Sequence, residues 1–262
     1  MIKVGGNIID DEVKLNDFLQ RFSAIKEKKI LVHGGGKLAT KLADKLGVAQ
    51  KMIEGRRITD TETLQIVTMV YAGQINKNIV VKLQANNCNA IGLCGADGNL
   101  ILAHKRKSNI DYGFVGDIDE ININQLRYLL DKHDAVVVAP ITHDGKGQLL
   151  NTNADTIAQE LAKAGSSFAE TRLIYCFEKK GVLRDASDEE SVISSVTPLN
   201  YPALKNETLN GEPVISAGMI PKLENALKAV HAGVERVIIG KADELELLIN
   251  GQTGTVIQDE KY

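Results

Sequence analysis

Length, composition and charge exclude several classes of protein. The chain has 262 residues, of which 44% are hydrophobic and 25% charged, and its formal net charge is −3. This composition is ordinary for a folded enzyme and argues against a disordered chain. Aromatic residues make up only 4%, there is no tryptophan, and there is no basic excess. A nucleic-acid partner is therefore not expected.

Cysteine usage and hydropathy predict a cytoplasmic protein. The three cysteines form no CxxC pair, which suits a reducing compartment better than a disulfide framework. No stretch approaches 18 apolar residues, and the opening MIKVGGNII carries no cleavage signal. We expect a chain with no membrane partner.

The first third of the chain alternates short apolar runs with helical patterns. Residues 2–4 and 30–33 read as strands that run into glycines, and helices are expected over 37–46 and about 60–86. Such alternation predicts an α/β fold, with a mainly parallel sheet covered by helices on both faces. The helix over 60–86 is longer than one lobe needs, so a subunit interface is a reasonable use for it.

Shorter elements follow, and a second half begins near residue 170. The expected strands cover residues 90–93, 100–103, 114–118, 135–141, 172–177 and 237–239, and a helix closed by Gly165 is expected over 154–164. The boundary near residue 170 is placed from a change of pattern, because no linker-like composition marks it.

The run ILVHGGGK places three glycines between an expected strand and an expected helix. Backbone N–H groups and the helix dipole can receive an anion at such a corner. Two other interpretations stay open: a tight turn, or a dinucleotide site, because Gly34, Gly36 and Ala39 fit G-x-G-x-x-A and Glu54 follows about 20 residues later. The chain has neither a G-x-S-x-G nucleophile elbow nor a G-x-x-x-x-G-K-[ST] phosphate loop.

Several polar residues stand at unusual places. Lys3 interrupts an expected strand, and Lys222 falls in the first turn of an expected helix, where the dipole disfavours a cation unless an anion binds. Asn151 and Asp155 lie where the run LLNTNADTIA enters a helix, and Asn153 in that run is a natural cap. Arg57 can clamp a carboxylate with two parallel hydrogen bonds. Solvated lysines and simple helix capping remain the alternatives.

These motifs occur in a fixed order along nearly the whole chain: KVGGN, VHGGGK, GRRITD, VGD, NTNADTIA, KKGVL, AGMIPK and TGTVI. In this order the chain resembles the amino acid kinase family, in particular its N-acetylglutamate kinases. The resemblance implies a single αβα sandwich domain over residues 1–262. Its N-lobe, about 1–170, would bind an acylglutamate and form a homodimer, and its C-lobe, about 171–262, would bind ATP.

The resemblance also implies a reaction and roles for its residues. The enzyme would phosphorylate the side-chain carboxylate of an N-acyl-L-glutamate, as in arginine biosynthesis, with Mg²⁺ bound mainly through the ATP phosphates and no protein metal site. Lys3 and Lys222 would stabilise the transferring phosphoryl group, and Asp155 would hold the lysines. The substrate would meet Gly35, Gly36, Arg57 and Asn151, and the phosphate would meet Gly6, Gly35 and Gly36. The ATP-binding residues would be Glu178, Lys179, Lys180, Gly181, Val182, Leu183, Val214, Ile215 and Ser216.

The sequence departs from the family pattern in two places. FEKKGV replaces an Asp-containing T-D-V-x-G-V run on the adenine side of the nucleotide site. GLCGADG replaces GLSGKDG, which covers the amino acid site, so both N-acetyl- and N-succinylglutamate are candidate substrates. Members inhibited by arginine carry an extra N-terminal helix, whereas this chain begins at its first strand, so insensitivity to arginine is expected. The alternatives are a carbamate, glutamate 5- or uridylate kinase, a nicotinamide-dependent enzyme and an inactive regulatory module.

Overall fold

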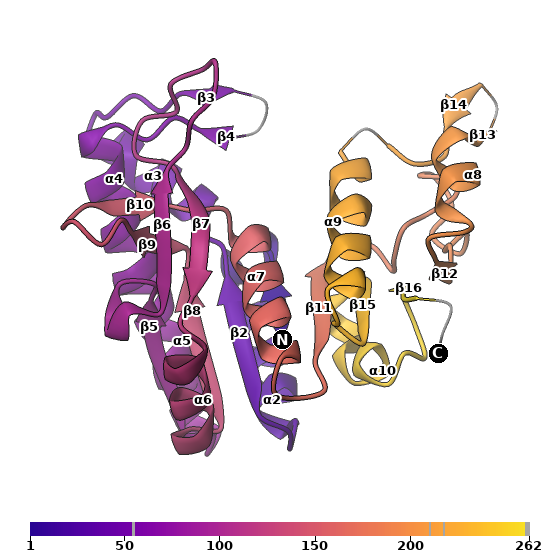
Figure 1. Cartoon of the computed structure of the whole chain (residues 1–262), viewed down its shortest axis with the longest axis horizontal. Helices are drawn as coiled ribbons and strands as arrows, with labels where there is room; N and C mark the ends of the chain where they lie inside the picture. The colour runs from indigo at the N-terminus through magenta and orange to yellow at the C-terminus, as the bar shows by residue number, and fades with distance from the viewer. Residues whose placement is uncertain (54–55, 210, 217, 260–262) are drawn as a thin grey trace. The chain divides into compact units, whose positions relative to one another are not determined.

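A computed structural model of the chain describes residues 1–53, 56–209, 211–216 and 218–259 (Figure 1). The chain divides into two compact units: unit 1 comprises residues 1–3 and 158–262, and unit 2 comprises residues 4–157. Met1–Lys3 belongs with the C-terminal residues because the Met1 carbonyl accepts a hydrogen bond from the Ile174 amide at 2.9 Å.

Unit 2 contains a parallel sheet in the order β2-β8-β5. The strands are β2 (Lys29–His33), β8 (Ala135–Ala139) and β5 (Ala90–Cys94). Every residue of β2 and β8 is buried, as expected of strands covered on both faces. Helices α5 (Asn76–Ala85) and α6 (Ile123–Lys132) both contact β8 (Figure 1). The α/β prediction is confirmed.

The long helix expected over residues 60–86 is present but not uniform. It consists of α4 (Thr61–Thr68), a π-helical segment (Met69–Ile75) and α5. The Asp60 carboxylate caps it by accepting a hydrogen bond from the Thr63 amide at 2.8 Å, and this bond lowers the pKa of Asp60. The sequence pattern gave no sign of the π-helical segment.

A second, four-stranded sheet of unit 2 has the order β10-β9-β6-β7. Its strands are β6 (Ile101–Lys105), β7 (Gly116–Ile121), β9 (Ile141–His143) and β10 (Leu149–Asn151). The single strand expected over 135–141 is in fact two, because Pro140 has no N–H to continue a ladder. Helix α7 (Ala154–Ser166) follows and runs through Gly165 instead of ending before it.

In unit 1, β11 (Arg172–Phe177) pairs parallel with β15 (Arg236–Lys241), and β15 pairs antiparallel with β16 (Thr255–Ile257). Helices α9 (Ile220–His231) and α10 (Leu245–Ile249) contact β15 (Figure 1).

The remaining elements come from both units. They are β1 (Ile2–Val4), α1 (Gly6–Ile9), α2 (Glu12–Ala24), α3 (Gly36–Lys45), β3 (Met52–Ile53), β4 (Arg56–Arg57), 3₁₀ turns (Asp97–Asn99 and Ala242–Glu244), β12 (Ser195–Val196), α8 (Tyr201–Asn206), β13 (Thr208–Leu209) and β14 (Glu212–Pro213). Within the described ranges, no helix has the length and apolar character to cross a bilayer.

Candidate active site

The glycine run follows β2 in unit 2 and forms a crowded corner. Gly35 has φ 151°, and a Cβ there would lie 2.2 Å from Ile75 Cδ1 and 3.1 Å from Tyr71 Cδ1. A Cβ there would force the end of the Ile75 side chain to move, and the positive φ strains any other residue, so glycine is favoured at this position. A Cβ on Gly34 would lie 4.0 Å from the Gly6 amide nitrogen, which brings the two glycine loops together. Backbone N–H groups gathered in this way suit an anion.

A buried histidine fixes the start of this corner. His33 is completely buried, its Nδ1 lies 2.8 Å from the Gly34 carbonyl, and its Nε2 lies 3.4 Å from Asn76 Nδ2. Since a carbonyl can only accept, we assign the proton to Nδ1 and the acceptor role to Nε2. Burial lowers the pKa of His33 to about 4. The imidazole is therefore a neutral structural link and not an acid or base near neutral pH.

Arg57 lies at the end of β4 and is tied to the glycine corner. Its Nη2 donates to the Gly36 carbonyl at 3.0 Å and to Thr40 Oγ1 at 2.9 Å, and its Nη1 donates to Gln50 Oε1. Gln50 in turn donates to Thr63 Oγ1 at 3.2 Å. These bonds hold the guanidinium in one orientation, which is what recognition of a carboxylate requires.

Asn151 ends β10 and is linked to the same region through Thr59. Its Nδ2 donates to Thr59 Oγ1 at 3.0 Å, and Thr59 Oγ1 donates to the Arg57 carbonyl at 3.3 Å. Asn153 caps α7 by accepting from the amides of Asp155 and Thr156 at 2.8 and 3.1 Å, which confirms the predicted cap. Asp155 itself lies in the first turn of α7, where a carboxylate complements the helix dipole.

Two charged groups flank Gly6. Both carboxylate oxygens of Asp10 are buried and have no hydrogen-bond partner among the described residues, and a Cβ on Gly6 would lie 3.6 Å from Asp10 Oδ2. Burial raises the pKa of Asp10, and the positive charges of Lys37 and Lys41 partly offset this rise. The Lys37 ammonium donates to Asn7 Oδ1. Lys37 and Lys41 both lie on α3, so the helix that follows the glycine run carries positive charge near its first residues.

The two lysines predicted to be catalytic meet in unit 1. Lys3 Nζ lies 5.7 Å and Lys222 Nζ 4.2 Å from the centroid of the Phe177 ring, so both ammonium groups lie near the same aromatic ring. Lys3 is only 9% exposed, and Lys222 stands in the first turn of α9, as predicted. Two cations beside one ring favour an anionic group near them.

The predicted ATP-binding stretches also lie in unit 1. Gly181 and Val182 are buried against β16, where the Val182 amide donates to Thr255 Oγ1 at 2.8 Å and a Cβ on Gly181 would lie 2.8 Å from that oxygen. Packing thus suffices to explain this glycine. The ammonium groups of Lys179 and Lys180 pair with Glu189 and Glu190. Glu178 and Ser216 are exposed, Leu183 is half-buried, and Val214 and Ile215 are buried.

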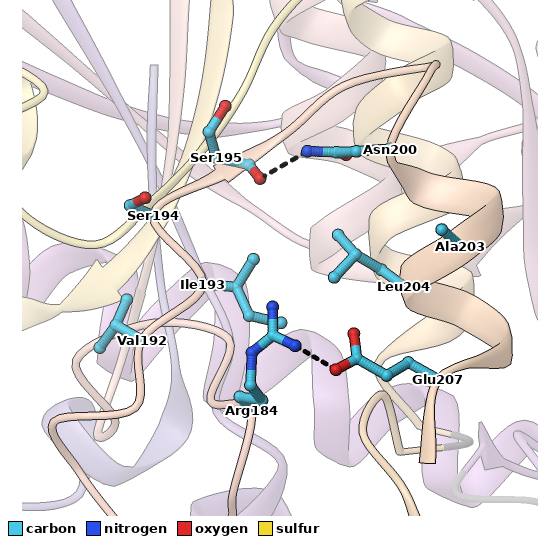
Figure 2. Close-up of a pocket in the computed structure, with 9 residues that line it drawn as sticks. All are labelled: Arg184, Val192, Ile193, Ser194, Ser195, Asn200, Ala203, Leu204 and Glu207. Atoms are coloured by element: carbon cyan, nitrogen blue, oxygen red, sulfur yellow. Dashed lines mark hydrogen bonds and ion pairs between the residues drawn. The ribbon is translucent and has the colours of Figure 1, made fainter. Parts of the chain in front are cut away.

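Unit 1 also contains a cavity of about 370 Å³ (Figure 2). Arg184, which follows Leu183, pairs with Glu207 across the cavity, and the Glu207 carbonyl accepts from the Val214 amide at 3.0 Å. The lining residues are Arg184, Val192, Ile193, Ser194, Ser195, Asn200, Ala203, Leu204 and Glu207. None of them was predicted from the sequence.

The structure brings some predicted residues together and leaves others unconnected. Gly6, Gly35, Gly36, Arg57 and Asn151 belong to one hydrogen-bonded and packed region of unit 2, and Lys3 and Lys222 share Phe177 in unit 1. Glu54, the acidic residue of the dinucleotide alternative, lies outside the described residues.

Sequence reasoning missed the residues that support this region. They are His33, Thr40, Gln50, Thr59, Tyr71, Ile75 and Phe177. Only Thr59 carried a usable signal, because it directly precedes the helix cap Asp60 and follows Arg57 by two residues.

Comparisons with known proteins identify similar chains. The chain is 56% identical over 252 residues to an acetylglutamate kinase from Cytophaga hutchinsonii, covering 95% of this chain and 94% of the relative. It is 53% identical to one from Phocaeicola vulgatus, covering 98% and 97%, and 36% identical to one from Methanopyrus kandleri, covering 98% and 99%.

Solved structures show the same fold. A Streptococcus mutans protein superposes with a TM-score of 0.75 at 29% identity, covering 98% of this chain and 97% of that one. Carbamate kinase from Giardia superposes with a TM-score of 0.64 at 14% identity, covering 99% and 98%, which shows likeness of fold alone. The model of the amino acid kinase family matches residues 1–241. The chain therefore belongs to the amino acid kinase family.

Proposed function

We propose that this enzyme transfers the γ-phosphoryl group of ATP to the side-chain carboxylate of N-acetyl-L-glutamate, giving an acyl phosphate for arginine biosynthesis. The observation that carries the proposal is the 56% identity, over nearly the full length of both chains, to a protein named acetylglutamate kinase. The nicotinamide-dependent alternative loses its support, because the glycine run lies within residues 1–241, which match the amino acid kinase family.

The residues in unit 2 supply substrate binding in this proposal. The Arg57 guanidinium, held by Gly36 and Thr40, would bind a substrate carboxylate, and Asn151 would bind the polar groups around the amide. The backbone N–H groups of Gly6, Gly35 and Gly36 would face the phosphoryl group. No general base is needed, since a carboxylate nucleophile is already ionised at neutral pH.

The residues in unit 1 supply charge stabilisation. In phosphoryl transfer the protein mainly positions the reactants and stabilises charge on the equatorial oxygens. Lys3 and Lys222, held beside Phe177, would do this, and Asp155 would hold the lysines in the reacting complex. Mg²⁺ would neutralise charge on the phosphates and stay bound to phosphate oxygens and waters. The stretches 178–183 and 214–216 would bind the nucleotide.

The assembly and compartment are also proposed. Met69 and Val81 are 54% and 60% exposed on the long helical segment, which supports a homodimer through this segment. Cys88, Cys94 and Cys176 are buried free thiols, which supports a reducing cytoplasm.

A hydroxamate assay tests the function. The enzyme is incubated with ATP, Mg²⁺ and hydroxylamine, and N-acetylglutamate, N-succinylglutamate and free glutamate are compared. Product from N-acetylglutamate but not from free glutamate supports the proposal. The N-succinyl arm is included because GLCGADG departs from the family loop, and faster turnover of that substrate would replace acetyl by succinyl in the proposal.

A further inference from the structure

Thr59 is a completely buried residue whose polar groups are all hydrogen-bonded. Its amide donates to the Tyr112 carbonyl at 2.9 Å, and its carbonyl accepts from the Phe114 amide at 2.6 Å. Its hydroxyl donates to the Arg57 carbonyl at 3.3 Å and accepts from Asn151 Nδ2 at 3.0 Å. One threonine thus connects β4, the segment Tyr112–Phe114 and the end of β10.

The directions of these bonds follow from chemistry. A hydroxyl has one proton, and the Arg57 carbonyl can only accept, so that proton points to Arg57. The Thr59 oxygen therefore offers a lone pair to Asn151, which must present its NH₂ group there. If the Asn151 side-chain amide were rotated so that Oδ1 faced Thr59, the single hydroxyl proton could serve either Oδ1 or the Arg57 carbonyl, and one of the two hydrogen bonds of the hydroxyl would be lost. Thr59 thereby decides which way the Asn151 amide points.

The segment Tyr112–Phe114 prevents Thr59 from moving. Gly113 has φ +71°, and a Cβ there would lie 2.1 Å from the Thr59 carbonyl oxygen, so the two backbones touch. The Phe114 carbonyl also accepts a hydrogen bond from the backbone N–H of Asn151 at 2.8 Å. Thr59, Phe114 and Asn151 form a closed ring of hydrogen bonds, and the Thr59 hydroxyl has one position within it.

We propose that Thr59 is a positioning residue: it fixes the Asn151 side-chain amide with Nδ2 toward the Thr59 hydroxyl, so that Oδ1 accepts a hydrogen bond from the amide N–H of the N-acylglutamate. The inference rests on the proposed function, because it assigns a role within the same substrate site. An N-acylglutamate carries one amide N–H, and a flipped Asn151 would meet that donor with another donor.

The test compares Thr59→Val, which keeps the shape but removes the hydroxyl, with Thr59→Ser, which keeps the hydroxyl. In Thr59→Val we expect the KM for N-acetylglutamate to rise about tenfold while the KM for ATP is unchanged. Thr59→Ser is expected to stay within about twofold of the wild-type KM. A purely structural role would lower stability and the active fraction without this split, and would overturn the inference.

Thr68→Val is the matched control. Its hydroxyl is buried without a hydrogen-bond partner in the part of the chain that the structure describes, and it lies on the neighbouring helix α4. The same substitution there is expected to leave both KM values unchanged. Should Thr59→Val fail to fold, Thr59→Ala is measured in its place, with the same expected KM split.

Two further measurements separate this inference from the proposed function. Because Thr59 acts through Asn151, the double variant Thr59→Val/Asn151→Ala should have the same KM as Asn151→Ala alone, and additive effects would overturn the inference. Independently of any turnover, the side-chain amide resonance of Asn151, assigned by its loss in Asn151→Ala, should shift in Thr59→Val but not in Thr68→Val. If the wild type phosphorylates no acylglutamate, the proposed function is wrong. If the Asn151 side-chain resonance does not shift in Thr59→Val, the positioning role is wrong, whatever the enzyme's activity.

Discussion

His33 shows how one buried side chain makes a functional corner depend on pH. Its imidazole bonds to the Gly34 carbonyl and to Asn76, whose Nδ2 also donates to the Val137 carbonyl at 3.1 Å in β8. The glycine corner is thus connected to the centre of the unit 2 sheet. A proton on Nε2 would remove the acceptor that Asn76 needs, which adds to the cost of burying a charge.

This link predicts a pH-dependent stability. The pKa of His33 is about 4 in the folded protein and 6.5 when unperturbed, so the unfolded chain takes up more protons at mildly acidic pH. Stability is therefore lost as the pH falls from about 6.5 to about 4, by about 2 kcal/mol between about pH 7 and about pH 5. Urea unfolding of the wild type and His33→Asn at both pH values measures this. Equal losses in the two proteins would contradict the assignment.

Arg57 predicts a specific effect on substrate binding. In Arg57→Lys the single ammonium group cannot reproduce the planar guanidinium that bonds to Gly36 and Thr40, so the cation is no longer held in one orientation for the substrate carboxylate. We expect the KM for N-acetylglutamate to rise about tenfold or more, with little change in the KM for ATP. Arg56→Lys, at the exposed neighbouring arginine, is the control. Steady-state kinetics with each substrate varied would contradict this account if both variants behaved alike.

At the scale of elements, the glycine corner depends on the π-helical segment. Ile75 and Tyr71 approach Gly35 so closely that an added methyl group would force the end of the Ile75 side chain to move. The sequence predicted both the strand and the glycine turn, because three glycines before a helix allow little else. It did not predict what packs on the turn, because the run MVYAGQI carries no local signal that separates π-helical from α-helical geometry.

Gly35→Ala is therefore expected to damage catalysis. The new methyl would push the corner away from Ile75, and a displacement of about 1 Å at a reacting group costs about a hundredfold in rate. Gly47→Ala is the matched control: its φ is +71°, so it introduces strain, but nothing lies within 4 Å of the new Cβ. Both variants should lose thermal stability, and only Gly35→Ala should lose kcat/KM. Equal activity losses would argue against the corner as a catalytic element.

Helix α7 illustrates where element boundaries escaped the sequence. Gly165 was expected to end the helix, yet α7 continues to Ser166. A Cβ at Gly165 would lie 3.1 Å from Thr171 Oγ1, so this glycine makes room for the chain that follows. The prediction likewise joined β8 and β9 into one strand, because the apolar run on both sides of Pro140 gives no sign that the strand ends there. Packing between distant residues decides such boundaries, and a single sequence does not display it.

At the scale of the whole molecule, the sequence predicted the fold class and the family. It carried no local sign that Lys3 belongs to the same compact unit as Lys222 and Phe177. The pairing of the first residues with β11 causes this, and such pairing across the length of the chain leaves no local pattern. The motif order, in contrast, was visible because it is linear.

Assembly gives a prediction at this scale. Val81→Glu places a charge on the exposed apolar side chain of α5, and it should dissociate the proposed homodimer into chains of 28.4 kDa. Val13→Glu, at a 78% exposed valine on α2, is the control and should leave the mass unchanged. Light scattering at matched concentrations measures both. A wild type that already runs at 28.4 kDa would contradict the dimer.

The central claim is that the enzyme uses ATP to phosphorylate N-acetylglutamate and that Lys222 stabilises the transferring phosphoryl group. The most direct measurement is the yield of hydroxamate from N-acetylglutamate, ATP and Mg²⁺ in the wild type and in Lys222→Met, with ATP binding followed by calorimetry. We expect hydroxamate from the wild type, and a loss of about a hundredfold or more in Lys222→Met while ATP still binds. No hydroxamate from the wild type, or an undiminished yield from Lys222→Met, would contradict the account.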